Sequence, residues 1–349
     1  MNKPDLSICV FAYKQYEQIR EFLDVAKTIS ERNIEILVSD DSEDDSIKKL
    51  VESYYDDRFR HIFNEKGHGA DSNYLNAMEE AFSDYVWIFR STDIVIPESV
   101  TSVIELIRAN TDCALFHFSS CSGKDVIERI YKDERTKYVP QKYNSKQSSL
   151  WRSGTVHPSG YIVNKTCCDF ELYRYMICQF FDDYLTSNVA FILQLADLAI
   201  KGESYFSSIV AWKYVDTLKR LDIATNSPHG KNPFGLEFEY SRYRLLFKYS
   251  ESLGDEIVRK EVIKAVVHTF AKQILHVFGK RNSSALFLRH YGCGAVEFNS
   301  FIEMKHFIKV SNMLLERNEK KFSGLRLFIY REAILYGVIK PIIYKVRNK

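Results

Sequence analysis

Glycine and proline are scarce in this sequence, with 14 and 7 residues among 349. Both residue types interrupt helices and strands, so their scarcity excludes collagen-like and low-complexity chains and predicts a compact protein rich in regular secondary structure. The composition, 46% hydrophobic and 27% charged, is typical of globular proteins. A chain of this length is too long for one typical core, so we expect two domains.

The cysteines lack the spacing of a metal or disulfide framework. There are seven, an odd number, and none are spaced as C-x-x-C pairs. This pattern indicates neither a zinc site nor a set of disulfides, and it predicts reduced, mostly buried thiols. The net charge of +2 argues against nucleic acid as a partner, because proteins that bind it usually carry a clear excess of Lys and Arg.

Long hydrophobic runs are also absent from the sequence. No window reaches the roughly 18 apolar residues of a membrane span. The opening residues, MNKPDL, lead into a strand pattern without the apolar stretch of a signal peptide. We therefore expect a cytoplasmic protein.

Short apolar runs alternate with segments of helical spacing over the first 120 residues. We predict strands at residues 6–11, 34–39, 61–64, 85–89 and 113–119, and helices at residues 16–30, 70–82 and 98–108, with a further helix after Ser46. Pro97 fits the first position of one of these helices. The alternation predicts an α/β fold with a mostly parallel sheet covered by helices.

The rest of the chain divides by composition. Residues 124–149 are polar and lose periodicity, so we expect a long surface loop or lid there. A strand at 160–164, helices at 167–178 and 187–200, and a strand near 204–212 complete an α/β domain predicted to span residues 1–225. Pro, Gly and Asn gather at 226–235 as a linker. Residues 236–349 are predicted to form a helical C-terminal domain.

Acidic residues follow the second predicted strand, in the run DDSEDDS from Asp40 to Ser46. Ligands of a doubly wound sheet bind outside the carboxyl ends of its strands, where one of these carboxylates could accept a hydrogen bond from a ribose or a base. The alternative is that the run only forms a turn and caps the next helix. The segment NEKGHG, which follows the third strand, is on its own an ordinary turn.

Four ordered motifs resemble family 2 glycosyltransferases of the GT-A fold, in particular abequosyltransferase-like members that build bacterial surface polysaccharides. The motifs are LSICVFAY from Leu6, VSDDS from Val38, Asn64 followed by GADSNYL, and WIFRSTD from Trp87. The resemblance covers the first 110 residues well and continues weakly to about residue 215. It implies an enzyme with a Rossmann-like, mostly parallel sheet, which transfers a sugar from a nucleoside diphosphate to a hydroxyl of a bacterial glycan with inversion.

The resemblance also implies roles for individual residues. The nucleotide would be held by the backbone of Phe11, Ala12 and Tyr13 and by the carboxylates of Asp40 and Asp41, with Asp71 and Asn73 near the ribose and phosphates. This chain departs from the family where Phe11 and Lys14 replace a Pro and an Asn, and where Ser72 replaces an Arg. A nucleotidyltransferase is a poorer match, because the loop FAYKQ has no glycine to cradle phosphates.

The largest departure lies in the metal motif. The family's cluster of Asp residues is replaced by Arg90-Ser-Thr-Asp93, which leaves Asp93 as the carboxylate for a divalent cation, Mn²⁺ or Mg²⁺. Arg90 could instead help to neutralise the diphosphate, because a guanidinium pairs well with phosphate oxygens. The alternative for Arg90 is a surface ion pair.

A catalytic base is expected where the family places an acidic residue late in the domain. Asp182 and Asp183 match that place, just before the helix predicted at 187–200. The alternative is that they complement the dipole of that helix. His157 could contact the acceptor or the diphosphate, although a lone histidine is more often structural.

The end of the chain, residues 324–349, is apolar and basic. Its charged residues are Glu332 and, against it, Arg326, Arg331, Lys340, Lys345, Arg347 and Lys349. Such a segment can lie on an anionic membrane surface, where a lipid-linked acceptor would be found. The alternative is a helix docked on the protein or on a second subunit of a homo-oligomer.

A rival hypothesis from another class concerns the whole chain. The loss of the acidic metal cluster at Arg90-Ser-Thr-Asp93 would suit a catalytically silent, glycosyltransferase-like binding or scaffold protein. The carboxylates at the expected nucleotide and acceptor ends favour the enzyme, because a silent domain needs neither.

Overall fold

The computed structural model describes residues 3–65, 69–122, 127–129, 131–137, 157–178, 190–214, 245–246, 248–259 and 262. The chain divides into two compact units. The first comprises residues 1–142, 156–179 and 187–226, and the second comprises residues 143–155, 180–186 and 227–349. In the described part of the second unit, residues 248–252 and 256–259 are helical. The elements described below belong to the first unit.

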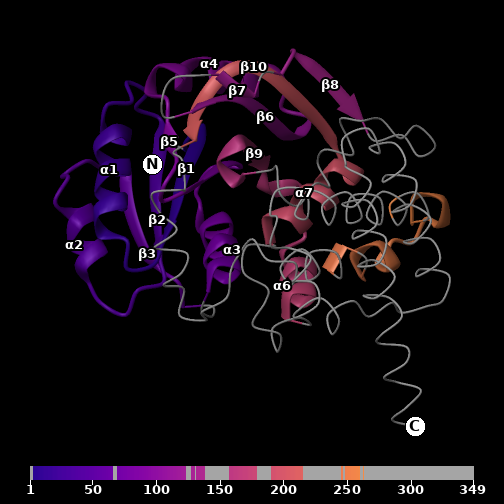
Figure 1. Cartoon of the computed structure of the whole chain (residues 1–349), viewed down its shortest axis with the longest axis horizontal. Coiled ribbons are helices and arrows are strands. Elements are labelled where there is room, and N and C mark those ends of the chain that lie inside the picture. The colour runs from indigo at the N-terminus through magenta and orange to yellow at the C-terminus, as the bar shows by residue number, and fades with distance from the viewer. Residues whose placement is uncertain are drawn as a thin grey trace, which may run out of the picture. The chain divides into compact units, whose positions relative to one another are not determined.

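Four parallel strands form one half of the sheet (Figure 1). They are β1 (Leu6–Ala12), β2 (Ile34–Asp40), β3 (Phe59–Phe63) and β4 (Tyr85–Arg90), in the order β3-β2-β1-β4. β1 is parallel to both of its neighbours, β2 and β4. The strands β1 and β2 are buried along almost their whole length, as expected for apolar runs that have helices over both faces of a sheet.

The other half of the sheet is mixed. β9 (Tyr161–Asn164) runs antiparallel between β4 and β6 (Cys113–Ser122), and β10 (Glu203–Tyr214) is parallel to β6. The short strands β5 (Ile94–Val95) and β8 (Glu134–Lys137) pair with β10, and β7 (Ile127–Arg129) pairs with β6.

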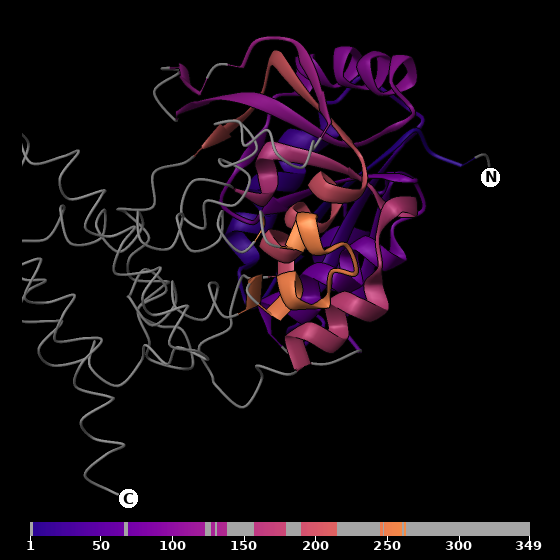
Figure 2. The same cartoon turned by 90° about the vertical axis from the view of Figure 1, so that its right-hand side faces the viewer.

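Helices lie on both sides of the parallel strands (Figure 1). On one side, α1 (Tyr16–Lys27) packs with α2 (Ser46–Glu52). On the other side, α3 (Ala70–Glu80) contacts β1 and β2 and packs with α6 (Phe170–Cys178) and α7 (Ala190–Lys201). Figure 2, turned by 90°, shows α6 and α7 nearer the viewer than the parallel strands. A single turn of 3-10 helix at Pro97–Ser99 leads into α4 (Val100–Ala109).

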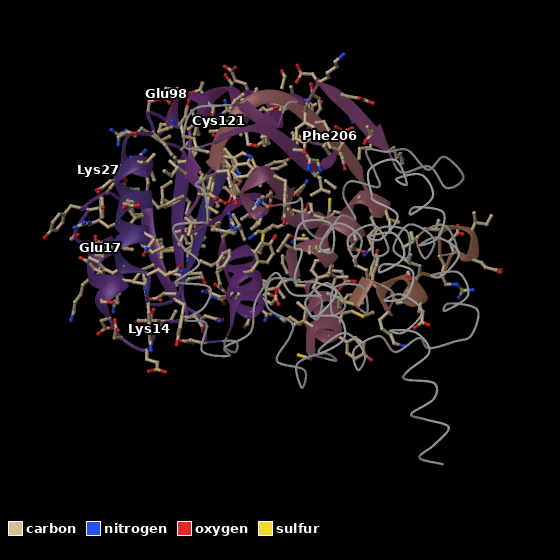
Figure 3. The ribbon with its side chains drawn as sticks, in the orientation of Figure 1. Lys14, Glu17, Lys27, Glu98, Cys121 and Phe206 are labelled. Carbon is tan, nitrogen blue, oxygen red and sulfur yellow. The ribbon has the colours of Figure 1, made fainter. Side chains whose placement is uncertain are left out.

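The amphipathic pattern of α1 explains its place. Ile19, Phe22 and Leu23 are buried against the sheet, whereas Glu17 and Lys27 point away from it (Figure 3). Of the helices that the structure describes, none is long and apolar enough to cross a membrane.

The predicted α/β fold is confirmed, and so are the strands and helices expected in residues 6–122, 160–178 and 190–212, to within a few residues at their ends. The prediction of a loop throughout residues 124–149 was wrong in part, because β7 and β8 lie within it. β8 is an edge strand with a polar sequence, ERTK, and mostly exposed residues, so it lacks the apolar alternation that marks a half-buried strand. The predicted linker at 226–235 lies outside the described residues.

Candidate functional site

The order of the parallel strands reverses beside β1. The chain passes from β1 to β2 and β3 on one side, and then returns through α3 to β4 on the other side of β1. In open α/β sheets, ligands bind at such a switch point, outside the carboxyl ends of the strands. Phe11 lies beside Ser39 on one neighbouring strand and beside Arg90 on the other, and Ala12 lies beside Asp40. The sequence predictions for β1, β2 and β4 therefore converge on one edge of the sheet, which we call the crevice edge.

The carbonyl oxygen of Ala12 joins three elements at the crevice edge. It accepts hydrogen bonds from the backbone N–H of Asp41, at 3.0 Å, and from the side-chain amide of Asn73, at 2.9 Å. The other end of the Asn73 amide, Oδ1, accepts from the hydroxyl of Ser39 at 2.6 Å. Asn73 is 2% exposed. A buried amide that uses both its ends is a rigid link, and here it fixes the start of α3 to the ends of β1 and β2.

Asp41 organises the loop that leads into α3. Its Oδ1 accepts from Asn64 Nδ2 at 3.1 Å, and its Oδ2 accepts from the backbone N–H of Gly69 at 2.7 Å. Gly69 has φ +101°, a left-handed conformation that glycine adopts without steric cost. Asn64 and Gly69 belong to one of the four motifs that resemble family 2 glycosyltransferases, and both donate a hydrogen bond to the carboxylate of Asp41.

Asp40 is buried at the end of β2, with 1% of its surface exposed. Its Oδ1 accepts from the backbone N–H of Ser42 at 2.9 Å, and its Oδ2 lies 3.3 Å from Nε2 of His61. His61 was not selected from the sequence. Its position in the sequence could have identified it, because it lies two residues before the end of β3, the strand next to β2, and so close to the crevice edge.

Asp71 and Asn73 differ in what they contact. Asp71 Oδ1 accepts a hydrogen bond from the backbone N–H of Ala190, the first residue of α7, at 2.7 Å. Asp71 thus satisfies a donor at a helix start, where backbone N–H groups lack partners within the helix. The sequence predicted both residues to lie near the ribose and phosphates, and that role stays a prediction.

Arg90 and Asp93 form a bidentate ion pair at the end of β4. Arg90 donates from Nε to Asp93 Oδ2 at 3.0 Å and from Nη2 to Asp93 Oδ1 at 2.9 Å. The hydroxyl of Ser159 also donates to Asp93 Oδ2, at 2.7 Å. Burial lowers the pKa of Arg90, but the adjacent carboxylate outweighs it, and the pKa lies above its usual value, so the guanidinium stays charged.

The exposed fractions of the two side chains differ. The side chain of Arg90 is 24% exposed, whereas that of Asp93 is 0% exposed. Both oxygens of Asp93 are already hydrogen-bonded, and in the part of the chain that the structure describes no group of three or more His, Cys, Asp or Glu residues could hold a metal ion. A divalent cation needs accessible hard oxygen ligands. The described residues around Asp93 therefore do not fit the predicted Mn²⁺ or Mg²⁺ site.

Ser159 was missed by the sequence analysis, which noticed its segment only for His157. The carbonyl of Ser159 accepts from the indole N–H of Trp87 at 2.8 Å, and its hydroxyl also accepts from the backbone N–H of Arg90 at 3.2 Å. The ring of His157 packs against Tyr214, with 4.9 Å between ring centroids. The guanidinium of Arg90 lies 5.7 Å from the centroid of the same tyrosine ring. The segment 157–159 thus supports Arg90 and its surroundings.

Two predicted sites lie outside the described residues. They are the pair Asp182 and Asp183, proposed as catalytic bases, and the basic segment 324–349. Their roles stay predictions from the sequence.

A mostly parallel sheet with polar residues gathered at its switch point defines a nucleotide-binding α/β domain. Residues 7–176, just under half of the chain, match the family described as Glycosyl transferase family 2. The chain is similar to the abequosyltransferase RfbV of Salmonella typhimurium strain LT2, with 27% identity over 128 residues. That match covers 35% of this chain and 38% of RfbV, well under two thirds of the relative's length.

Solved structures of TarS from S. aureus show the same fold. TarS 1–349 matches with a TM-score of 0.55 and 14% identity, covering 98% of this chain and 91% of that one. Its complex with UDP-GlcNAc matches with a TM-score of 0.55 and 16% identity, covering 98% and 92%. At these identities the likeness shows the fold alone, and it confirms the GT-A class predicted from the sequence.

Proposed function

We propose that this protein transfers a sugar from a nucleoside-diphosphate donor to a hydroxyl of a bacterial surface glycan, a polysaccharide, lipopolysaccharide or similar polymer. The observation that carries the proposal is the crevice edge, where Ala12, Asp41 and Asn73 are locked together beside Asp40 at the switch point of a family 2 domain. The similar proteins support it, since RfbV is named as an abequosyltransferase and TarS was solved with UDP-GlcNAc.

The nucleoside would bind on the β2 side of the crevice edge. Asp41, in the loop directly after β2, would accept a hydrogen bond from a ribose hydroxyl or a base N–H. Asp40, whose side chain is fully covered, would hold this loop in place through the backbone N–H of Ser42. The backbone of Phe11, Ala12 and Tyr13 follows β1 into the same place. Tyr13 is 40% exposed, and its ring offers a surface for stacking the base.

The transfer would proceed with inversion. The acceptor hydroxyl attacks the anomeric carbon of the sugar, the bond from that carbon to the diphosphate oxygen breaks, and the nucleoside diphosphate leaves with the electron pair. Asp182 or Asp183 takes the proton of the hydroxyl. The predicted Mn²⁺ or Mg²⁺ has no step in this scheme, because Arg90 and Ser159 occupy the oxygens of Asp93.

The proposal includes the rest of the chain. Residues 1–225 would form the catalytic domain and residues 236–349 a helical domain. In the second, the segment 324–349 would bring the protein to the cytoplasmic face of a membrane that carries a lipid-linked acceptor.

A thermal-shift screen tests the proposal. A ligand that binds only the folded protein stabilises it by about 2.7 kcal/mol at a hundredfold excess over its Kd. That gain raises the Tm of a domain of this size by roughly 5–10 °C. We expect such a shift with UDP or CDP, and we expect Asp40→Asn and Asp41→Asn to reduce it. Asp133→Asn is the control, because Asp133 pairs with Ser208 on β10 instead.

Two outcomes would count against the proposal. If neither Asp40→Asn nor Asp41→Asn alters the shift, the nucleotide site lies elsewhere. If nucleoside diphosphates bind but no sugar donor is hydrolysed or transferred, the silent scaffold hypothesis gains support.

A further inference from the structure

We propose that Arg90 takes the place of a divalent cation at the crevice edge: its guanidinium binds the diphosphate of the donor directly, and this binding needs no added metal. The inference rests on the proposed function, and it goes further by assigning the group that neutralises the leaving diphosphate. It starts from the disagreement between the predicted metal site at Asp93 and the contacts that Asp93 makes.

Exposure decides which charge a ligand meets. The side chain of Asp93 is wholly covered, whereas 24% of the side chain of its partner Arg90 is exposed. An anion that approaches the end of β4 therefore contacts a positively charged group. A cation that approaches the same place would be repelled by the guanidinium before it could reach the carboxylate.

The ion pair with Asp93 uses the Nε–Nη2 edge of the guanidinium. A guanidinium has five N–H donors in a planar fork. Asp93 accepts from Nε and from one hydrogen of Nη2, and a further contact of the side chain goes to Tyr214. The donors of Nη1 point away from the edge that Asp93 holds. Two phosphate oxygens match such a fork, and these charge-assisted bonds are among the strong ones.

The register of the strands places Arg90 where a diphosphate would extend. Arg90 lies beside Phe11 on β1, and Asp40 lies beside Ala12 on the opposite side of that strand. The Cα atoms of the two residues are thus roughly two strand spacings, about 10 Å, apart. With the ribose at Asp41, the phosphates would cross the end of β1 toward β4.

Asp93 and Ser159 act as positioning residues for Arg90. Asp93 holds the guanidinium at two points, and Ser159 binds both Asp93 and the backbone N–H of Arg90. The next residue, Ser91, donates to Gln15 at 2.5 Å and so ties the loop after β4 to the loop after β1. A donor group that is fixed before the reaction stabilises developing negative charge without reorganisation, as the departing diphosphate requires.

Calorimetric titration of the full-length chain tests the inference. The probes are UDP or CDP, whichever gives the larger thermal shift, and the matching nucleoside, each with EDTA and with Mn²⁺. We expect the same diphosphate affinity in both conditions. Arg90→Ala should weaken diphosphate binding roughly 10- to 100-fold, the range for a lost hydrogen bond to a charged group, and leave nucleoside binding unchanged. Arg90→Lys should fall between, because it keeps the charge and loses the fork.

Arg174→Ala is the matched control. Arg174 forms a similar bidentate ion pair with Glu79, at 2.8 and 2.9 Å, and its side chain is 27% exposed, but it lies on α6. We expect it to leave diphosphate binding unchanged.

Asp93→Asn distinguishes a positioning role of Asp93 toward Arg90 from a role as a metal ligand. If Asp93 only positions Arg90, the variant binds diphosphate somewhat more weakly and equally with and without Mn²⁺. A wild type that binds diphosphate only with Mn²⁺, together with Asp93→Asn that loses the response, would overturn the inference in favour of a metal site.

Two further outcomes complete the test. If Arg90→Ala weakens nucleoside and diphosphate equally, or if it and Arg90→Lys fail to bind any probe, Arg90 is structural and the inference fails. A wild type that binds no nucleotide in either condition contradicts the proposed function itself.

Discussion

Lys14, the second residue after β1, adopts a backbone conformation that residues with a side chain disfavour. Its φ is +52°, and its backbone N–H donates to the hydroxyl of Ser42 at 2.8 Å. The left-handed region costs an ordinary residue about 1–2 kcal/mol, and asparagine tolerates it best after glycine. Such strain is common at ligand sites, and Lys14 lies at the crevice edge, at the lower end of the sheet in Figure 3.

We expect Lys14→Asn to stabilise the protein by about 0.5–1 kcal/mol, as relief of a left-handed residue does. The midpoint of urea unfolding measures the change. Lys14→Ala is the control, because alanine has the same Cβ clash and should gain nothing. Equal gains from both substitutions would show that the lysine side chain, and not the backbone, is the source of the strain.

Asp71 allows its two proposed roles to be separated by one substitution. If it serves α7 through Ala190, Asp71→Ala should cost about 1 kcal/mol, the usual cost of a lost helix cap, and leave the affinity for UDP or CDP unchanged. If it binds the ribose, the affinity should fall. Urea unfolding and calorimetry on the same variant distinguish the roles, and Asp133→Ala controls for the loss of a carboxylate.

The sequence indicated which residues gather at the crevice edge better than it indicated what they contact. Asp40 and Asp41 were selected because parallel strands end together, and Asn73 was selected from the resemblance to family 2 glycosyltransferases. Their hydrogen-bond partners could not be predicted from the sequence, because these partners are distant along the chain. Asp41 binds Gly69, 28 residues further on, and Asn73 binds the carbonyl of Ala12, 61 residues back. The pair of Arg90 and Asp93 is local, yet Ser159, which completes it, lies 66 residues from Asp93.

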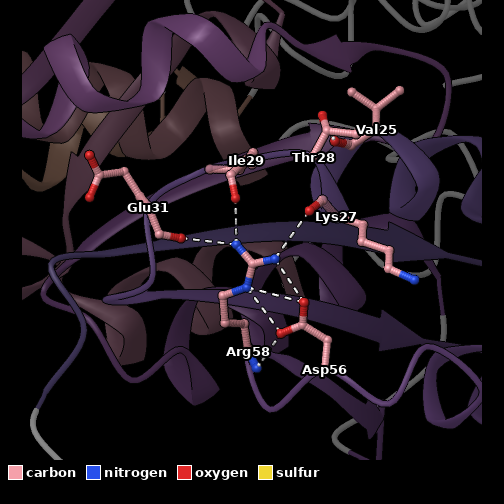
Figure 4. A network of polar contacts seen from close by, with 7 residues as sticks. All are labelled: Val25, Lys27, Thr28, Ile29, Glu31, Asp56 and Arg58. Carbon is pink, nitrogen blue, oxygen red and sulfur yellow. Dashed lines mark hydrogen bonds and ion pairs between the residues drawn. The ribbon is translucent and has the colours of Figure 1, made fainter.

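At the level of elements, Arg58 holds the end of α1 in place (Figure 4). Its guanidinium donates to the carbonyls of Ile29 and Glu31, at 2.8 and 2.9 Å, and of Lys27, at 3.2 Å. Asp56 balances its charge through Nε and Nη2, at 3.0 and 2.7 Å. The side chain of Arg58 is 3% exposed. Carbonyls after the last turn of a helix need donors, and one side chain supplies three of them here.

Arg58→Met should destabilise the protein by about 3–5 kcal/mol, because it leaves a largely buried carboxylate without its counter-charge. Urea unfolding measures the loss. Arg135→Met is the control: Arg135 also pairs with two carboxylates, of Asp112 and Glu203, but its side chain is 39% exposed and the cost should be at most about 1 kcal/mol. Similar losses from the two variants would mean that burial does not decide the strength of these pairs.

Elements with apolar periodicity were predicted from the sequence, and elements held by distant pairing were not. The structures of β1 and α1 can be predicted from their own residues, because β1 is a short apolar run and the apolar residues of α1 recur every three or four positions. β8 has neither. It is ordered by its ladder with the start of β10 and by the ion pair of Arg135 with Glu203, 68 residues away. No local pattern in ERTK carries that information.

At the scale of the whole molecule, the first compact unit is discontinuous in sequence. Residues 143–155 and 180–186 belong to the second unit, although segments of the first unit lie on both sides of each. The boundary predicted at 225 and the linker predicted at 226–235 lie outside the described residues and stay predictions. Asp182 and Asp183 fall within residues 180–186, outside the described residues, and their role as catalytic bases stays a prediction.

The last prediction concerns residues 324–349, whose basic side chains would meet an anionic membrane. Removing the segment should leave the affinity for UDP or CDP unchanged, because the residues proposed to hold the nucleotide all lie between Phe11 and Arg90. Binding to vesicles that contain anionic lipid should fall, since each Lys or Arg near such a surface is worth about 1 kcal/mol.

A charge variant of the full-length chain refines this test. Lys345→Gln, Arg347→Gln and Lys349→Gln together should weaken vesicle binding by roughly 100-fold, from about 1 kcal/mol for each charge. The matching control replaces Lys49, Lys132 and Lys137 of the first unit, which should have little effect. Vesicle binding that survives both the truncation and the charge variant would favour a helix docked on the protein or on a second subunit. In that case the truncation uncovers the apolar surface on which the segment was docked. If that surface belongs to a second subunit, sedimentation should show a changed oligomeric state. If it belongs to the same chain, urea unfolding should show a loss of stability.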